Sequence, residues 1–188
     1  MMSRIISVAI LGAVSLHAQD CAVTVLMSNL PPSLNAVTLF AAQAEVKEMF
    51  AAVGVKIAWR WGKIPRSAAD AQCRAPIAMQ FEPGEPRRKD AEAVAYATPF
   101  GKSGVQIHVF PDAIIVHGGT RNDIALLAHV LAHEIGHVLE RISRHSLTGI
   151  MKERFSVREI CSMASHPLSF AAEDVDLIRL GLDSASTK

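Results

Sequence analysis

The chain has 188 residues, half of them hydrophobic, which is enough to bury one sizeable core and is typical of a single domain. Its 19 basic and 18 acidic residues almost cancel. This balance gives no electrostatic reason to expect nucleic acid or an anionic membrane as a partner, so we expect neither.

Residues 1–18 have the pattern of a secretory signal peptide. Arg4 provides a basic start, an apolar run extends from Ile5 to Leu16, and the small residue Ala18 marks the expected cleavage site. The apolar run is too short to span a bilayer. We therefore expect residues 1–18 to be removed, residues 19–188 to form one domain, and the product to be secreted or periplasmic.

Three cysteines remain after such a cleavage: Cys21, Cys73 and Cys161. Export permits disulfides, and an odd number leaves at least one thiol unpaired. We favour a Cys21–Cys73 disulfide because each of these residues lies beside a predicted strand, although the connectivity stays open. Nothing around Cys161 resembles a cysteine-protease motif, so a structural cysteine is expected there.

The first half of the chain predicts a mixed sheet with a helix packed on it. Apolar residues recur at helical spacing from residue 34 to residue 53, and Gly54 follows as a stop. The glycines at positions 101 and 104 predict a hairpin between the last two strands. β-branched or alternating patterns predict strands at residues 21–30, 55–61, 75–81, 93–100 and 105–110.

The second half of the chain predicts helices. Thr120 and Asp123 approximate a capping box, and the helix that follows is apolar nearly all round. Such a helix is expected in the centre of the domain. A final helix is predicted over residues 170–180, between Ser169 and Gly181.

The stretch HEIGH, residues 133–137, has the spacing of a zinc site on this central helix. His133 and His137 leave the same face one turn apart, as two ligands of one tetrahedral Zn²⁺ require. Glu134 lies beside them, where it can act as a general base on a water molecule at the metal. Because polar side chains are costly on an otherwise apolar helix, this pattern favours a functional site over a chance match.

A catalytic zinc needs a third protein ligand and one open position. The helix cannot simply continue to the next histidine, since that would place it roughly 12 Å further along. The helix must therefore break within residues 140–143 and turn back. The candidates for the third ligand are His145, His166, Glu159 and Glu173.

HEIGH followed by HSLTGIM (145–151) resembles the metzincin superfamily of zinc peptidases, in particular secreted bacterial members with a lengthened spacing to the third histidine. That family has the pattern HExxHxxGxxH and then a methionine-bearing turn below the metal. The resemblance covers nearly the whole domain, because the predicted order of elements also matches. It implies an α+β, zincin-like fold with a mixed twisted sheet, an antiparallel edge strand, a backing helix, a central active-site helix, a Met-turn and a C-terminal helix.

The resemblance also implies roles for individual residues. His133, His137 and His145 would bind Zn²⁺, Glu134 would be the catalytic general base, and Met151 would be the methionine of the Met-turn. The strand at residues 105–110 would be the edge strand that receives the substrate. Glu159 and Glu173 rank well below His145 as the third ligand, because they would leave HSLTGIM unexplained.

The chain departs from the family pattern in the turn before the third histidine. The family's third ligand would fall on Ser143, and its helix-ending glycine would fall on Glu140. Neither Glu140 nor Arg141 adopts a left-handed conformation cheaply. The tyrosine that some metzincins carry after the Met-turn is missing as well, since Phe155 follows Met151 here.

The other histidines have simpler interpretations. His129 lies one turn before His133 and is expected to be a core histidine with satisfied hydrogen bonds, although it could support the site. His108 is expected to have no metal role. His166 is expected to be a loop histidine rather than part of a specificity pocket.

Together these patterns predict a secreted zinc metallopeptidase, an endopeptidase that acts as a monomer on peptide or protein substrates. Glu134 would take the proton of a zinc-bound water during peptide hydrolysis. The alternative is a metzincin-like zinc-binding protein without activity, serving as a binding module. A domain with a chance HExxH and no metal is a third, weaker hypothesis.

Overall fold

The computed structural model describes residues 22–62, 76–84, 94–101, 104–115 and 119–184. The expected signal peptide and the expected Cys21–Cys73 disulfide lie outside these residues. Cys161 is described, and it is an exposed free thiol.

The core of the fold is a five-stranded mixed sheet with the strand order β2-β1-β3-β5-β4. All neighbouring strands are parallel except β4 and β5, which form an antiparallel hairpin. The mixed sheet with an antiparallel edge strand is therefore confirmed. The strands are β1 (Val23–Ser28), β2 (Ile57–Trp61), β3 (Ile77–Phe81), β4 (Ala95–Gly101) and β5 (Gly104–Val109).

The edge strand is not the one that the sequence predicts. β5 lies between β3 and β4, so the prediction that residues 105–110 form the edge is wrong; the edge strand of the hairpin is β4, and the opposite edge of the sheet is β2. A hairpin can join a sheet through either of its strands, and sequence pattern does not decide which. Here Met79 and Ile107 pair across β3 and β5 and are both fully buried, which fixes β5 inside the sheet.

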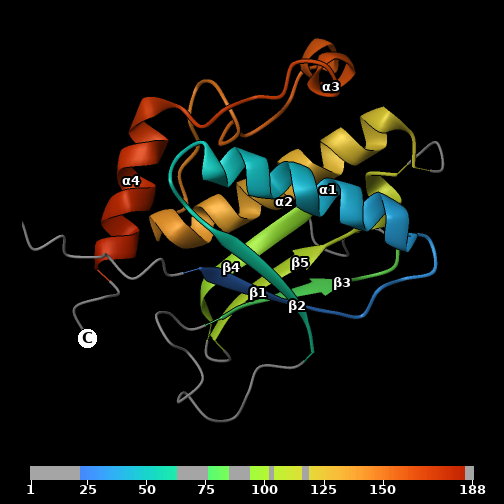
Figure 1. Ribbon diagram of the computed structural model, residues 1–188, viewed down its shortest axis with the longest axis horizontal. Coiled ribbons are helices and arrows are strands. Elements are labelled where there is room, and N and C mark those ends of the chain that lie inside the picture. The colour runs from blue at the N-terminus through green and yellow to red at the C-terminus, as the bar shows by residue number, and fades with distance from the viewer. Residues whose placement is uncertain (1–21, 63–75, 85–93, 102–103, 116–118, 185–188) are drawn as a thin grey trace, which may run out of the picture.

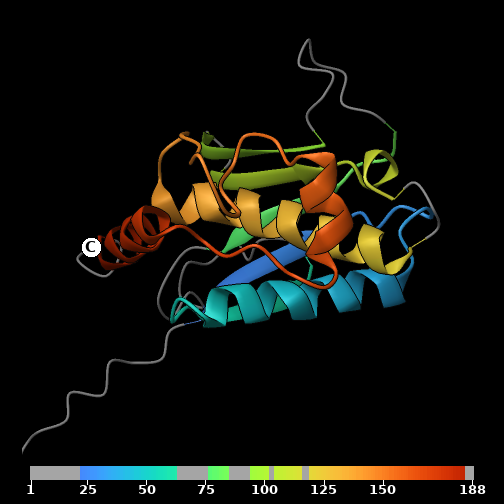
Figure 2. The same ribbon diagram turned by 90° about the horizontal axis from the view of Figure 1, so that it is seen from above.

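Two long helices, α1 (Ala36–Ala51) and α2 (Arg121–Glu140), pack side by side on one face of the sheet (Figure 1). The 3₁₀ turn η2 (Pro111–Ala113) follows β5. The helices α3 (Val157–Met163) and α4 (Ala172–Asp183) both pack on α2, and α4 lies at its C-terminal end (Figure 2). The backing helix, the central helix and the C-terminal helix are thus confirmed.

The helix α2 is the centre of the molecule, as its apolar surface predicts. It begins at a capping box in which the Asp123 N–H donates to the Thr120 hydroxyl over 3.3 Å and the Asp123 carboxylate accepts from the Thr120 N–H over 2.9 Å. Every residue from Leu127 to Glu140 except His133 is buried. The polar residues of HEIGH are therefore held on a rigid, buried element.

The helix α4 starts later and ends later than predicted. Its N-cap is Ala171 rather than Ser169, and Gly181 lies inside the helix rather than after it. The glycine serves close packing instead of termination, because a methyl group at Gly181 would overlap the carbonyl oxygen of Leu139 in α2. The two helices therefore approach each other backbone to backbone.

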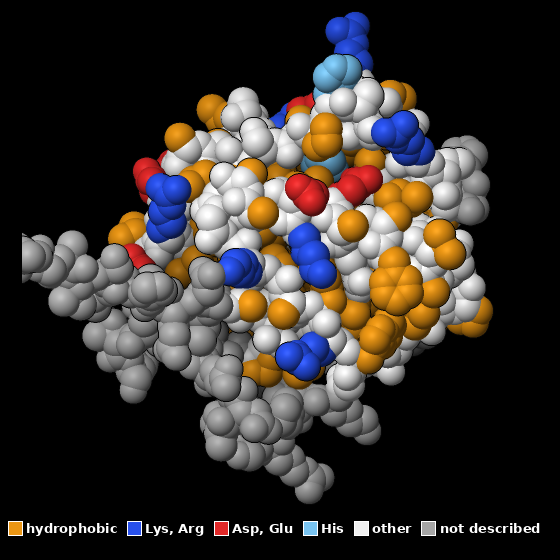
Figure 3. Space-filling model, in the orientation of Figure 1, with side chains coloured by type: hydrophobic (Ala, Val, Ile, Leu, Met, Phe, Trp, Pro, Cys, Tyr) orange, Lys and Arg blue, Asp and Glu red, His pale blue; other side chains and the backbone are white. Residues whose placement is uncertain are grey.

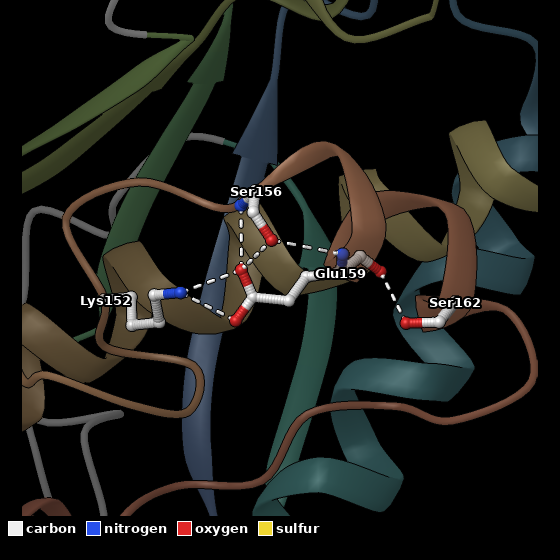
Figure 4. Close-up of polar contacts among 4 residues, drawn as sticks. All are labelled: Lys152, Ser156, Glu159 and Ser162. Atoms are coloured by element: carbon white, nitrogen blue, oxygen red, sulfur yellow. Dashed lines mark hydrogen bonds and ion pairs between the residues drawn. The ribbon is translucent and has the colours of Figure 1, made fainter.

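The short helix α3 is absent from the sequence prediction. Its N-terminus is a capping box in which Ser156 accepts from the Glu159 N–H and the Glu159 carboxylate accepts from the Ser156 N–H over 2.7 Å (Figure 4). The ammonium of Lys152 contacts both Glu159 carboxylate oxygens, at 2.7 and 2.8 Å. The ion pair ties α3 to the turn that contains Lys152.

Apolar side chains gather on one part of the surface, over the N-terminal half of α1 and the neighbouring sheet edge (Figure 3). Val37 and Phe40 of α1 are 77% and 62% exposed, and Trp61 of β2 is 51% exposed.

In the described ranges, no helix combines the length and apolar character needed to cross a membrane.

Candidate metal centre and active site

Three histidines come together at the surface of α2: two belong to this helix, and the third belongs to the segment that follows it. One ring nitrogen from each of His133, His137 and His145 lies within 4.8 Å of the others. The Nε2 atoms of His133 and His137 are 3.0 Å apart. The ring centroid of His145 lies 5.3 Å from that of His133 and 5.0 Å from that of His137. The three residues that the sequence proposes as ligands thus form one group.

The turn that delivers His145 is made by Arg141 without a glycine. Arg141 has φ 60° and ψ 24°, a left-handed conformation, and its N–H donates to the His137 carbonyl over 3.0 Å. This closes the last turn of α2 and sends the chain back towards the helix. A residue with a Cβ atom in this conformation costs roughly 1–2 kcal/mol, so the surrounding structure must hold it there.

The Met-turn follows as predicted and packs against the HEIGH segment. The Ser146 N–H donates to the Met151 carbonyl over 2.8 Å. Gly149 has φ 78°, and a methyl group there would overlap the backbone oxygen of Ser169. Met151 is fully buried, and its sulfur occupies the space that a methyl group on Gly136 would need. Met151 therefore contacts the helical turn between the two HEIGH histidines.

The two histidines of HEIGH have lowered pKa values, which favours the neutral imidazole. The His133 Nδ1–H donates to the Ile150 carbonyl over 2.8 Å, so its Nε2 carries no proton in the neutral ring and faces the His137 Nε2 3.0 Å away. Burial lowers the pKa of His133. Burial, followed by the neighbouring His133 and His145, lowers the pKa of His137 to about 4. Neutral imidazoles are the form that binds a metal.

The arrangement of these nitrogens fits a tetrahedral metal ion. Two nitrogens bound to one Zn²⁺ at about 2.0–2.1 Å in tetrahedral geometry are about 3.3 Å apart. The 3.0 Å separation of the His133 and His137 Nε2 atoms is close to this value. His145 is exposed, while His137 is buried, so the group faces solvent on one side. Three protein ligands with an open side is the pattern of a catalytic zinc site.

Glu134 is a buried carboxyl group next to this group of histidines. It is 7% exposed, and its Oε2 has no hydrogen-bond partner in the part of the chain that the structure describes. Burial raises the pKa of Glu134 to about 8, and a hydrogen bond from the Ala97 backbone N–H lowers it. Glu134 can therefore take up and release a proton near neutral pH.

The other candidates for a third ligand do not join the group of histidines. Glu159 is engaged by Lys152 and by the cap of α3. The Glu173 side chain is 73% exposed and lies 3.5 Å from Arg144. His166 is exposed, with its Nδ1 3.0 Å from the Ser165 hydroxyl. Among the described residues, only the three histidines cluster closely enough to hold one ion.

His129 is a core histidine with satisfied hydrogen bonds, as expected. It is fully buried, its Nδ1–H donates to the Ala125 carbonyl over 2.7 Å, and its Nε2 accepts from the Leu168 N–H over 2.9 Å. Phe155 lies next to it, with ring centroids 6.1 Å apart, and 6.5 Å from the ring of His133. His129 thus connects α2 to the segment before α4.

His108 lies on β5 and does not belong to the group of three histidines. Its Nδ1 is hydrogen-bonded to the Glu82 carboxylate, and its ring stacks on that of Tyr96 with centroids 4.7 Å apart. His108 is therefore engaged in contacts between strands.

Asp174 is the residue at this site that the sequence prediction misses. It is fully buried at the start of α4, where it accepts hydrogen bonds from Arg144 and Ser146, the two neighbours of His145. In the sequence it is one of two acids in the first turn of a helix, which helix-end electrostatics alone explains. No local pattern indicates partners some thirty residues away.

The comparisons with known proteins support the fold. No protein-family profile matches the sequence, and no curated protein does. The structure is similar to that of an archaemetzincin from Methanopyrus kandleri, with a TM-score of 0.58 and 13% identity, over 89% of this chain and 99% of that chain. At this identity the likeness establishes the fold alone. The chain therefore has an archaemetzincin-like, zincin-type fold, as the resemblance of HEIGH and HSLTGIM implies.

Proposed function

We propose that this protein is a secreted zinc-dependent peptidase with its active site at His133, His137 and His145. The observation that supports this most directly is the convergence of three histidine nitrogens within 4.8 Å. A buried carboxyl group, Glu134, follows His133 directly and has one oxygen without a partner in the described part of the chain. Together they provide three metal ligands and one general base, the minimum for metal-assisted hydrolysis.

The roles of the residues follow from their chemistry. The three histidines would hold a zinc ion, which when bound would supply Lewis-acid polarisation of a substrate carbonyl and activation of a water molecule. The Glu134 carboxylate accepts the proton of the attacking water and passes it to the leaving amine. In the metal-free chain, burial in a low-dielectric surrounding raises the pKa of Glu134 to about 8. A cation held by the three histidines would favour the ionised carboxylate, which is the form that accepts the proton.

The open edge of β4 supports a peptide as the substrate and internal cleavage as the reaction. In the described part of the chain β4 has one partner strand, β5, which leaves its other edge unpaired. An extended peptide can add to such an edge through main-chain hydrogen bonds, with neither of its ends required. The Ala97 backbone of β4 is close enough to lower the pKa of Glu134, so the edge strand and the general base are adjacent.

Metal analysis and peptide cleavage by purified protein test this proposal. We expect about one zinc per chain, as a site with one set of three histidines holds one ion. His145→Ala should lose most of the zinc, whereas Ser143→Ala, at the position of the family's third ligand, should keep it. Glu134→Gln should keep zinc but lower cleavage of a peptide library by roughly 10²–10⁴-fold.

Three outcomes would contradict the proposal. A wild-type protein without zinc after reconstitution would exclude the metal site. Equal zinc contents in wild type and His145→Ala would exclude His145 as a ligand. Zinc binding without cleavage of any library peptide would favour the binding-module alternative.

A further inference from the structure

The turn that carries His145 is held by one carboxylate of α4. The Arg144 Nη2 donates to the Asp174 Oδ1 over 2.9 Å, and the Ser146 hydroxyl donates to the same oxygen. These two residues immediately precede and follow His145 in the chain. One acceptor atom thus fixes the backbone on both sides of the proposed third ligand.

Asp174 is itself rigidly placed. Its side chain is fully buried, and its second oxygen accepts from the Ala171 N–H over 3.1 Å at the start of α4. Further along α4, Ile178 is fully buried, and Gly181 lets the helix approach the Leu139 carbonyl of α2. Because α2 carries His133 and His137, α4 holds the turn in a fixed position relative to the other two ligands.

The ring of His145 has no comparable support of its own. It is exposed, and in the described ranges no hydrogen bond of its side chain is found; its neighbours are the rings of His133 and His137. In contrast, His133 is fixed by its bond to the Ile150 carbonyl. The position of the His145 nitrogen therefore depends on the backbone of residues 144–146.

We propose that Asp174 is a positioning residue for the metal site, acting through Arg144 and Ser146 to place His145. This inference rests on the proposed function, since it assigns Asp174 a role toward the same zinc. Groups that orient a metal ligand typically contribute 10–100-fold in metal affinity, because a ligand that must be ordered on binding weakens the complex. Asp174 would supply this order before the metal arrives.

The test is the zinc dissociation constant of the full chain, measured by competition with a chelator. Asp174→Asn keeps the shape of the side chain but removes the charge that Arg144 and Ser146 share. We expect it to weaken zinc binding by roughly 10–100-fold. Asp176→Asn, an exposed aspartate two residues later on α4, is the matched control and should bind zinc as the wild type does.

A double-mutant cycle separates positioning from a general effect on folding. If Asp174 acts through His145, then Asp174→Asn should weaken zinc binding little further when His145→Ala is already present. An equal loss in both backgrounds would overturn the inference. Unchanged zinc affinity in Asp174→Asn would also overturn it, while leaving the zinc site of the wild type intact.

Ser146→Ala provides a second, gentler variant should Asp174→Asn fail to fold. It removes one of the two hydrogen bonds but keeps the backbone bond from Ser146 to Met151. We expect a smaller loss of zinc affinity than in Asp174→Asn, with unfolding in urea at nearly the wild-type midpoint. Wild-type affinity in this folded variant would count against Asp174. A wild type that binds no zinc would contradict the proposed function itself.

Discussion

At the residue scale, the most unusual position is Arg141, which reverses the chain with φ 60°. An L-residue in this region is strained because its Cβ atom approaches the following carbonyl oxygen. The strain is tolerated because the hydrogen bonds of Arg144 and Ser146 to Asp174 fix the chain beyond it. The sequence shows that a left-handed conformation is unfavourable for arginine. The spacing of the histidines alone does not show that Arg141 is the residue that adopts this conformation.

Glycine at position 141 should give a more stable protein than alanine at the same position. We expect the free energy of unfolding of Arg141→Gly to exceed that of Arg141→Ala by roughly 1 kcal/mol, because both variants lack the arginine side chain but only alanine keeps the Cβ strain. Urea unfolding of the two variants in the presence of a chelator measures the difference. Equal stabilities would show that the left-handed conformation carries no strain.

At the scale of the elements, the contact between α2 and α4 depends on a single missing methyl group. Gly181→Ala would normally stabilise a helix by roughly 0.5–1 kcal/mol. Here the added methyl group would overlap the Leu139 carbonyl, a backbone atom that cannot rotate away. We therefore expect the opposite sign, a loss of roughly 1–3 kcal/mol as α4 is pushed from α2. Thermal unfolding of the variant measures this.

The same substitution should also act on the metal site, because α4 carries Asp174. A fall in zinc affinity that accompanies the loss of stability is expected for Gly181→Ala. Leu180→Ala, at a position 62% exposed on the same helix, is the control and should change both quantities little. A Gly181→Ala variant that is more stable than wild type would contradict the close approach of the two helices.

The predictability of the elements follows from how locally each one is determined. α1, α2 and all five strands are predicted close to their observed bounds, because periodicity and caps are local properties of the sequence. α3 is missed, although the pair Ser156 and Glu159 is the sequence signature of its capping box. The end of α4 is predicted wrongly because Gly181 allows close packing on α2 instead of ending the helix. In the sequence, a glycine with this role looks the same as a glycine that ends a helix.

For the site, too, the residues defined by local sequence patterns were predictable, and the residue defined by packing between helices was not. His133, Glu134 and His137 share one helical turn, and HSLTGIM identifies His145 through its resemblance to a known pattern. Asp174 lies on another element, and its role depends on how α4 packs on α2. The edge strand was assigned wrongly for the same reason, since the order of β4 and β5 in the sheet is a tertiary property.

At the scale of the whole molecule, stability should depend on the buried acid that ends α2. Glu140 is 4% exposed, and neither of its carboxylate oxygens has a hydrogen-bond partner in the described ranges. Burial, followed by the nearby charge of Asp174, raises the pKa of Glu140 to about 7 from 4.5. The folded state therefore binds this proton more tightly than the unfolded chain does.

The sign of the pH dependence follows from linkage. Because the folded pKa is raised, the stabilisation is fully present below about pH 4.5 and is lost as the pH rises through about 7. We expect the loss to amount to roughly 1–3 kcal/mol of unfolding free energy and to be absent in Glu140→Gln. Urea unfolding at several pH values in chelator compares this variant with wild type and with Glu48→Gln, an exposed control on α1. Parallel pH curves for wild type and Glu140→Gln would refute this assignment.

The Ala97 backbone N–H of β4 is close enough to Glu134 to lower the pKa of its carboxyl group, so it connects the strand edge with the general base. One N–H group donates one strong hydrogen bond at a time. A peptide that takes this N–H as it pairs along the edge of β4 thereby withdraws a donor from the Glu134 carboxylate. Losing a donor makes a carboxylate a stronger base. We therefore expect a peptide bound along the edge of β4 to raise the basicity of Glu134.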